Sequence, residues 1–149
     1  MKSLISILLL IPVFSSCASP SKSELDAEVK RLCAIDGGVK VYEAVRLPAE
    51  RFDSRGTVDI FRPGRSEASL GSAYVYKEEK EVIVSGNPEM WRAHYKIIRK
   101  SDNKLLSEAR IYIRRGGDMS GPWHDSYFSC PDIKDFGVVE STFRIKSKE

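Results

Sequence analysis

The residues WRAHYKIIRK (91–100) and LLSEARIYIRR (105–115), joined by SDNK (101–104), decide the fold of this 149-residue chain. In both arms, apolar residues alternate with charged or polar ones. A period of two is typical of a strand with one buried and one wet face. Asp and Asn in the connection tolerate the backbone angles of a tight turn. The stretch therefore predicts an antiparallel hairpin with one wet face.

Further strands are predicted on both sides of this hairpin. They lie at Val39–Val45, with Val39, Val41 and Val45 facing the core, at Ala73–Lys77 and Glu81–Ser85 with a turn at residues 78–80, and at Val139–Ile145. The connections 48–69 and 116–128 are rich in turn residues and predict irregular segments, the first with a short strand at Thr57–Phe61.

A helix is predicted ahead of the first strand. Leu25, Val29, Leu32 and Cys33 fall on one helical face, and Ser23 has the chemistry of an N-cap. The helix is expected to end near Ile35, with Gly37-Gly38 as a left-handed C-cap. These elements predict an α+β fold, an N-terminal helix packed on a curved antiparallel sheet of about five to six strands.

The first residues indicate export. Lys2 precedes an apolar run from Leu4 to Phe14, which is about half the roughly 20 residues of a membrane-spanning helix. Ser15-Ser16-Cys17 resembles the lipobox of bacterial lipoproteins, in which the cysteine is acylated, although Phe14 stands where that family usually carries Leu. The alternative is cleavage after Ala18, which would release a soluble protein.

This interpretation divides the chain into a signal peptide (1–16), a tether (17–22) and one α+β domain (23–149). Removing the first 16 of 149 residues leaves 133, and the loss of Lys2 lowers the net charge from +3 to +2. A nearly neutral exported chain is a poor candidate for nucleic-acid binding. The expected membrane contact is the lipid on Cys17.

Two cysteines remain for an oxidising compartment. Cys33 and Cys130 are expected to form a disulfide that closes a loop of about 100 residues and stabilises the domain by about 2–4 kcal/mol. The alternative is a pair of buried free thiols. Neither cysteine has a partner at metal-ligand spacing, so no metal is expected.

The two histidines give little support to catalysis. His94 falls on the polar side of a strand, where a solvated structural role is expected. His124 lies beside Asp125 and Ser126, but neighbours in one loop cannot align as a catalytic triad. We therefore expect no catalytic residue and no cofactor.

The second irregular segment is the candidate for binding. Trp123, His124 and Tyr127 combine a loop with aromatic types that serve as interface anchors. The alternative is that these aromatic residues cover the end of the sheet beside the disulfide.

The stretch LCAIDGGVKVYE (32–43), running to Leu47-Pro48, resembles the opening of a group of uncharacterised small lipoproteins of Gram-negative bacteria and their prophages. The resemblance extends through the 91–115 hairpin and the Cys130 region. It implies a lipid-anchored envelope protein. Ala18, rather than Asp, after the acylated cysteine implies the outer membrane, facing the periplasm.

As function, the sequence favours a non-catalytic lipoprotein that acts by protein contact. Prophage lipoproteins of this size commonly act as inhibitors or exclusion factors. The alternatives are an enzyme acting on envelope polymer through His124 and Asp125, and a soluble periplasmic binder of a small ligand.

Overall fold

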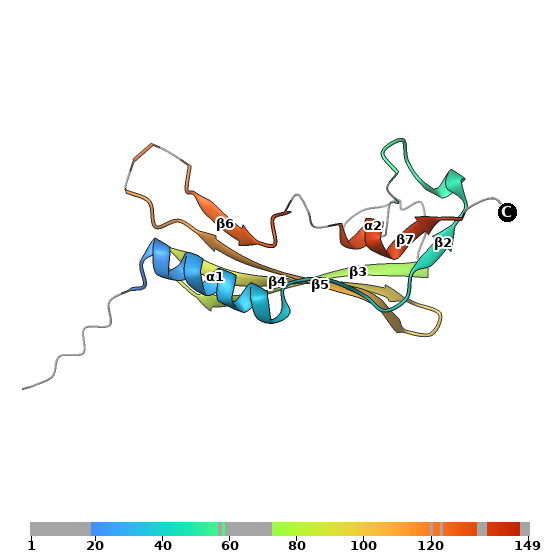
Figure 1. Cartoon of the computed structure of the whole chain (residues 1–149), viewed down its shortest axis with the longest axis horizontal. Coiled ribbons are helices and arrows are strands. Elements are labelled where there is room, and N and C mark those ends of the chain that lie inside the picture. Colours follow the sequence, from blue (N-terminus) through green and yellow to red (C-terminus); the bar gives the residue numbers. More distant parts are fainter. Residues whose placement is uncertain are drawn as a thin grey trace, which may run out of the picture.

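The computed structural model describes residues 19–56, 58, 73–119, 121–122, 124–133 and 137–146. Within them, a long helix, α1 (Lys22–Asp36), accompanies a five-stranded antiparallel sheet and a separate two-stranded pair. The predicted α+β class is confirmed, and Figure 1 shows the sheet as a long, twisted layer between elements on its two sides.

Three long strands form the body of the sheet: β3 (Tyr74–Val84), β4 (Glu89–Arg99) and β5 (Lys104–Arg115). The predicted central hairpin is β4–β5. The predicted turn at residues 78–80 is wrong, because these residues continue β3 and pair with Ala93–Tyr95. Their charged side chains are exposed on an edge strand rather than looped out.

The outer edge of β5 is shared by two short strands. β1 (Gly38–Val41) pairs with Ser107–Arg110, and β6 (Tyr127–Cys130) pairs with Tyr112–Arg115. The predicted irregular segment 116–128 therefore ends at residue 126, because β6 begins at Tyr127. The predicted strand Val39–Val45 is interrupted after Val41, which is exposed.

Each face of the sheet is covered by a different helix. On β5, Glu108, Arg110, Tyr112 and Arg114 alternate with Ser107, Ala109, Ile111 and Ile113, and we call these two sides the charged face and the apolar face. Helix α1 packs on the charged face, where Leu25 and Val29 contact Met90 and Tyr112. The expectation of one wet face is therefore wrong at the α1 end.

The start of α1 also differs from the prediction. Ser21, rather than Ser23, is the N-cap, and it forms a capping box with Glu24, so Lys22 belongs to the helix rather than to the tether. At the other end, Gly37 has an extended backbone, and the positive φ occurs at Gly38, the first residue of β1. The glycines thus turn the chain directly into the sheet instead of forming a left-handed C-cap.

A disulfide joins Cys33 of α1 to Cys130 of β6, as the sequence predicts, with a Cα–Cα distance of 5.7 Å. The two residues are 97 positions apart. The bond fixes α1 to the edge strand that it covers.

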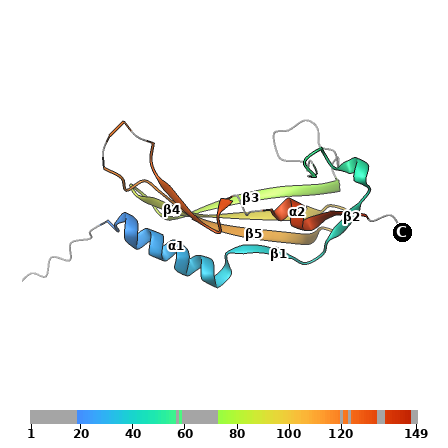
Figure 2. The same cartoon turned by 45° about the horizontal axis from the view of Figure 1, so that its top comes forward.

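The C-terminal segment packs on the apolar face at the other end of the sheet, as Figures 1 and 2 show. Helix α2 (Val138–Thr142) leads into β7 (Phe143–Ile145), which pairs in parallel with β2 (Val45–Leu47). The predicted continuous strand Val139–Ile145 is therefore wrong in its first half.

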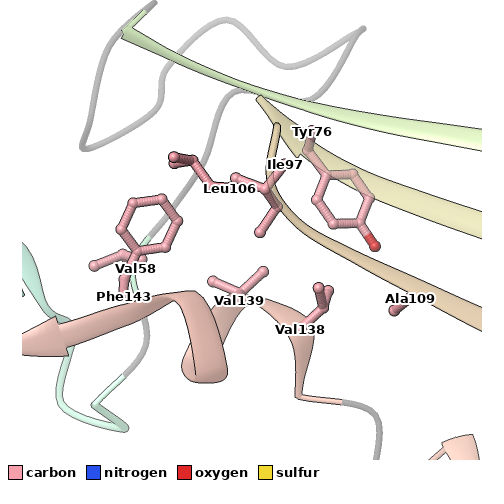
Figure 3. Packing of buried hydrophobic residues seen from close by; sticks show 8 residues of the cluster. All are labelled: Val58, Tyr76, Ile97, Leu106, Ala109, Val138, Val139 and Phe143. Carbon is pink, nitrogen blue, oxygen red and sulfur yellow. The ribbon is translucent and has the colours of Figure 1, made fainter. Parts of the chain in front are cut away.

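Helical spacing buries Val138, Val139 and Thr142 together, and the Thr142 hydroxyl donates to the Val138 carbonyl oxygen at 2.6 Å. Figure 3 shows Val138 and Val139 in the main core cluster, which contains Val58, Tyr76, Ile97, Leu106, Ala109, Val138, Val139 and Phe143. Beyond β2 the chain forms a short 3₁₀ helix, η1 (Ala49–Arg51). The short strand predicted at Thr57–Phe61 lies outside the described residues except for Val58, which is buried.

Candidate functional site

The predicted binding residues lie in and beside residues 116–126, which connect β5 to β6 and which we call the β5–β6 loop. His124 is exposed in this loop, and Tyr127, the first residue of β6, is 64% exposed. Met119, which the sequence analysis did not single out, is 91% exposed. Trp123 lies outside the described residues.

Hydrogen bonds close the base of the β5–β6 loop. The Gly116 N–H donates to the Ser126 carbonyl oxygen at 2.9 Å. Asp118 accepts from the Ser126 N–H at 2.6 Å and from the Ser126 hydroxyl at 2.9 Å. The Gly117 N–H donates to Oδ1 of Asn87, in the β3–β4 turn, at 2.7 Å.

Arg114, at the end of β5, connects this base to α1. Its Nη1 donates to the carbonyl oxygens of Gly116 and Ser126, each at 3.0 Å, and to the Ser126 hydroxyl at 2.9 Å. Its Nε and Nη2 bind the two carboxylate oxygens of Asp26 on α1 at 2.7 and 3.1 Å. The Arg114 side chain is 2% exposed, so this guanidinium is a buried link between the helix and the loop.

Lys22 forms a second link, from the first turn of α1. Its ammonium lies 2.6 Å from Asp118 Oδ1. This contact, with the N–H and hydroxyl donors of Ser126, holds the pKa of Asp118 well below its usual range. The base of the loop is therefore fixed to the start of α1, whereas Met119, His124 and Tyr127 face solvent.

The loop does not assemble a nucleophilic site around His124. The Ser126 hydroxyl already contacts Arg114 and Asp118. Asp125 pairs with Arg115 at 3.4 Å. The alternative of an enzyme that uses His124 and Asp125 therefore has no supporting geometry among the described side chains of this loop.

An open depression of about 610 Å³ lies beside the start of α1. Lys22, Asp26, Asn87 and Asp118 line it. These four side chains are engaged with one another or with the loop base, as described above. The depression therefore offers little support for a small-ligand site.

A second polar cluster lies on the charged face beyond the end of α1. Glu108 Oε1 accepts from the Tyr42 hydroxyl at 2.5 Å, and Oε2 lies 2.8 Å from His94 Nε2 and 2.9 Å from Arg110 Nη2. Burial tends to raise the pKa of Glu108, but the Tyr42 and His94 hydrogen bonds and the Arg110 charge outweigh it and lower that pKa. The predicted solvated role of His94 is wrong, because its side chain is 12% exposed.

The neighbouring residues extend this cluster to the helix. Asp36, the last residue of α1, accepts from the Tyr112 hydroxyl at 2.6 Å and lies 3.6 Å from Arg110 Nε. Neither His94 nor Glu108 lines the depression beside the start of α1. The geometry assigns this cluster to holding α1 and β1 against the sheet.

No protein-family model matches the chain, and no curated protein or solved structure matches it either. The resemblance to small lipoproteins therefore stays a prediction. In the ranges that the structure describes, no helix is long and apolar enough to span a membrane, and no group of three His, Cys, Asp or Glu side chains is arranged to hold a metal ion. Cys17 lies outside the described residues.

Proposed function

We propose that this chain is an exported lipoprotein, anchored through Cys17, that acts by binding an envelope protein through the β5–β6 loop. The observation that carries the proposal is an exposed apolar and aromatic pair, Met119 and Tyr127, beside a loop base closed by the Asp118, Ser126 and Arg114 contacts. Exposed aromatic and methionine side chains are enriched in protein interfaces.

The closed base favours binding because it reduces the conformational entropy that this part of the chain loses when a partner binds. A loop ordered before association loses less conformational freedom on binding than a flexible one. The base is also linked to α1 through Lys22 and Arg114. The recognition residues therefore project from a fixed support.

The position of the loop defines where the partner would lie. Five residue steps from Cys17 to Lys22 span at most about 18 Å in an extended chain, and Lys22 contacts the loop base directly. A lipid on Cys17 would thus hold the β5–β6 loop close to the membrane. The proposed partner is a protein exposed at the periplasmic side of the outer membrane, and the finer form of the proposal is that binding inhibits or excludes it.

Site-specific photocrosslinking tests the binding surface in intact cells. A photoreactive phenylalanine at Met119 or Tyr127 is expected to crosslink one and the same envelope protein. The matched control is Ile145, which is 54% exposed on β7 at the other end of the molecule and is expected to give no such product. Equal capture from residue 145, or lipid adducts alone from residues 119 and 127, would contradict the proposal.

A second experiment separates binding from folding. The double variant Met119→Ser/Tyr127→Ser is expected to lose co-purification of the crosslinked protein with the melting temperature nearly unchanged, while Ile145→Ser retains it. A large fall in melting temperature for the double variant would indicate that Met119 and Tyr127 stabilise the fold instead. Inhibition is then measured as the partner's activity with and without the parent chain.

The anchor has its own test. Metabolic labelling with a clickable palmitate analogue is expected to label the parent chain in the membrane fraction and to leave Cys17→Ser unlabelled. Unlabelled parent chain in the soluble periplasmic fraction would favour cleavage after Ala18 instead.

A further inference from the structure

Strand β3 has 11 residues and pairs with β4 along one of its two sides. None of the other described strands lies along its second side, and Figure 2 shows β3 at the margin of the sheet. Residues 77–83 are all exposed, including Val82 at 53%. Over the exposed residues 77–83, such an edge presents backbone donors and acceptors to another strand.

The side chains of this edge form a charge pattern with an internal symmetry. The residues Lys77-Glu78-Glu79-Lys80-Glu81 are flanked by Tyr76 and Val82. Charged residues on an edge generally oppose pairing with foreign strands. In this strand each charge other than Glu79 has an opposite charge at the mirrored position about Glu79.

We propose that β3 pairs in antiparallel fashion with β3 of a second copy of this chain, about a twofold axis through Glu79. This register places Glu78 opposite Lys80, Lys77 opposite Glu81, and Tyr76 opposite Val82, each pair occurring twice. Oppositely charged cross-strand pairs stabilise a sheet, whereas like charges directly opposite destabilise it.

Backbone geometry restricts the possible registers. In an antiparallel pair, residues directly opposite each other both direct their N–H and C=O groups toward the partner strand or both direct them away. Because this direction alternates along a strand, a symmetric pairing of β3 must place its axis through a residue. An axis between Glu78 and Glu79, which would oppose Lys77 to Lys80, is therefore excluded.

The neighbouring permitted axes are inferior. An axis through Lys80 would place Glu79 opposite Glu81 twice, and an axis through Glu78 would place Val75 opposite Glu81. The axis through Glu79 is the midpoint of Tyr74–Val84 and therefore gives the longest overlap. A bulge between Val82 and Val84 limits the regular part to Tyr76–Val82.

The single like-charge contact of this register falls on the axis, where the two Glu79 side chains meet. Each Glu79 carboxylate is already bound by Lys96 from β4, with Nζ at 2.8 and 2.9 Å from its two oxygens. In the dimer, one Lys96 from each copy therefore lies beside each Glu79 carboxylate at the axis. The symmetry also places both α1 helices on the same face of the joined sheet.

A charge-swap experiment tests the pairing, with the full chain expressed with its leader and purified in mild detergent. Sedimentation equilibrium is expected to show a dimer for the parent chain. Glu78→Lys and Lys80→Glu each create two like-charge pairs and are expected to raise the dissociation constant by about tenfold or more. The double variant Glu78→Lys/Lys80→Glu restores opposite charges and is expected to return to the parent value.

Glu50→Lys is the matched control, because Glu50 is an exposed residue of η1 and the substitution changes the net charge as Glu78→Lys does. It is expected to leave the dissociation constant unchanged. A monomeric parent chain, or a double variant no better than the single variants, would overturn the proposal.

Cysteine crosslinking tests the register independently of the charges. Glu79→Cys places two thiols on the axis and is expected to form a disulfide-linked dimer on mild oxidation. In Val82→Cys the two thiols lie six residues apart along the strand, about 20 Å, and no such dimer is expected. The parent chain is the control for Cys17. Crosslinking through residue 82, or its failure at residue 79, would exclude this register.

Discussion

The two ends of the sheet are stabilised by different chemistry. At the α1 end, on the charged face, a small cluster around Leu25, Val29 and Met90 is supplemented by the Cys33–Cys130 disulfide and the Arg114 contacts. At the α2 end, on the apolar face, stability comes from a larger group of buried apolar side chains (Figure 3).

The difference between the ends has a functional consequence. Charged hydrogen bonds from Arg114 and Lys22 hold the base of the β5–β6 loop against α1. Apolar packing at the α2 end gives stability through contacts that are not directional. We therefore expect volume changes to affect the α2 end most, and loss of the Arg114 contacts or of the disulfide to affect the α1 end.

The largest effect is expected from Phe143→Ala in the apolar cluster. Phe143 is 2% exposed and its ring makes an edge contact with Tyr74, the ring centroids being 5.1 Å apart. Removing a buried aromatic ring costs about 3–5 kcal/mol of unfolding free energy. Urea denaturation measures this loss. Ile145→Ala, which alters an exposed residue of the same strand, should cost less than about 0.5 kcal/mol.

Removal of the disulfide should have a somewhat smaller effect, concentrated at the other end. The variant Cys33→Ala/Cys130→Ala opens a loop of 97 residues and is expected to lose about 2–4 kcal/mol. Hydrogen exchange should show lost protection in α1 and β6 before β7. Uniform loss across both ends would contradict the division of the molecule into two differently stabilised regions.

Arg114→Met tests the charged link itself. It leaves Asp26 and two loop carbonyl oxygens without their donor, which we expect to cost about 2–3 kcal/mol because Asp26 is partly exposed. Arg115→Met is the matched control, since Arg115 is exposed and forms a 3.4 Å contact with Asp125. Equal losses of stability in the two variants would show that Arg114 is not a special link between α1 and the loop base.

The comparison also separates what the sequence could predict from what it could not. The β4–β5 hairpin was predictable because its alternation is local. The pairing of Cys33 with Cys130 was predictable because, once Cys17 is assigned to the lipid, two cysteines remain. The charged residues 78–80 suggested a turn because an exposed edge strand and a polar turn have the same composition.

Helix α2 was missed for a related reason. Residues 139–145 satisfy an alternating pattern, and the buried positions Val138, Val139 and Thr142 also satisfy a helical one. The hydrogen bond between the Ser107 and Thr142 hydroxyls, 2.6 Å apart and fully buried, favours the helix but depends on a residue 35 positions away.

In the candidate site, the exposed loop residues were accessible to sequence reasoning, whereas the closed base was not. Lys22 and Asp118 are 96 positions apart, and Asp26 and Arg114 are 88 apart. A single sequence contains no signal for such pairs. The local signal that was available is Ser21–Glu24, which has the capping-box spacing and correctly marks the start of α1.

Acid is expected to weaken the Glu108 cluster on the charged face. The pKa of Glu108 is lowered in the folded protein, so its stabilising contribution is complete above the ordinary value of 4.5 and disappears as the pH falls through the lowered pKa. Between pH 6 and pH 3, Glu108→Gln should lose less stability than the parent chain in urea denaturation. Glu140→Gln, an exposed change in α2, should follow the parent; an identical pH dependence for Glu108→Gln would contradict this assignment.

The smallest effect concerns the N-cap of α1, which positions Lys22 beneath the loop. Ser21→Ala removes the acceptor for the Glu24 N–H, at 3.3 Å, and should cost about 1 kcal/mol. Ser23→Ala lies within the helix and should cost less than about 0.5 kcal/mol. Because Ser21 precedes Lys22, the Ser21 variant should also lower the protection of the Ser126 amide, which donates to Asp118. A larger effect from Ser23→Ala would indicate that the helix begins after Ser21 and that its first turn does not support the loop base.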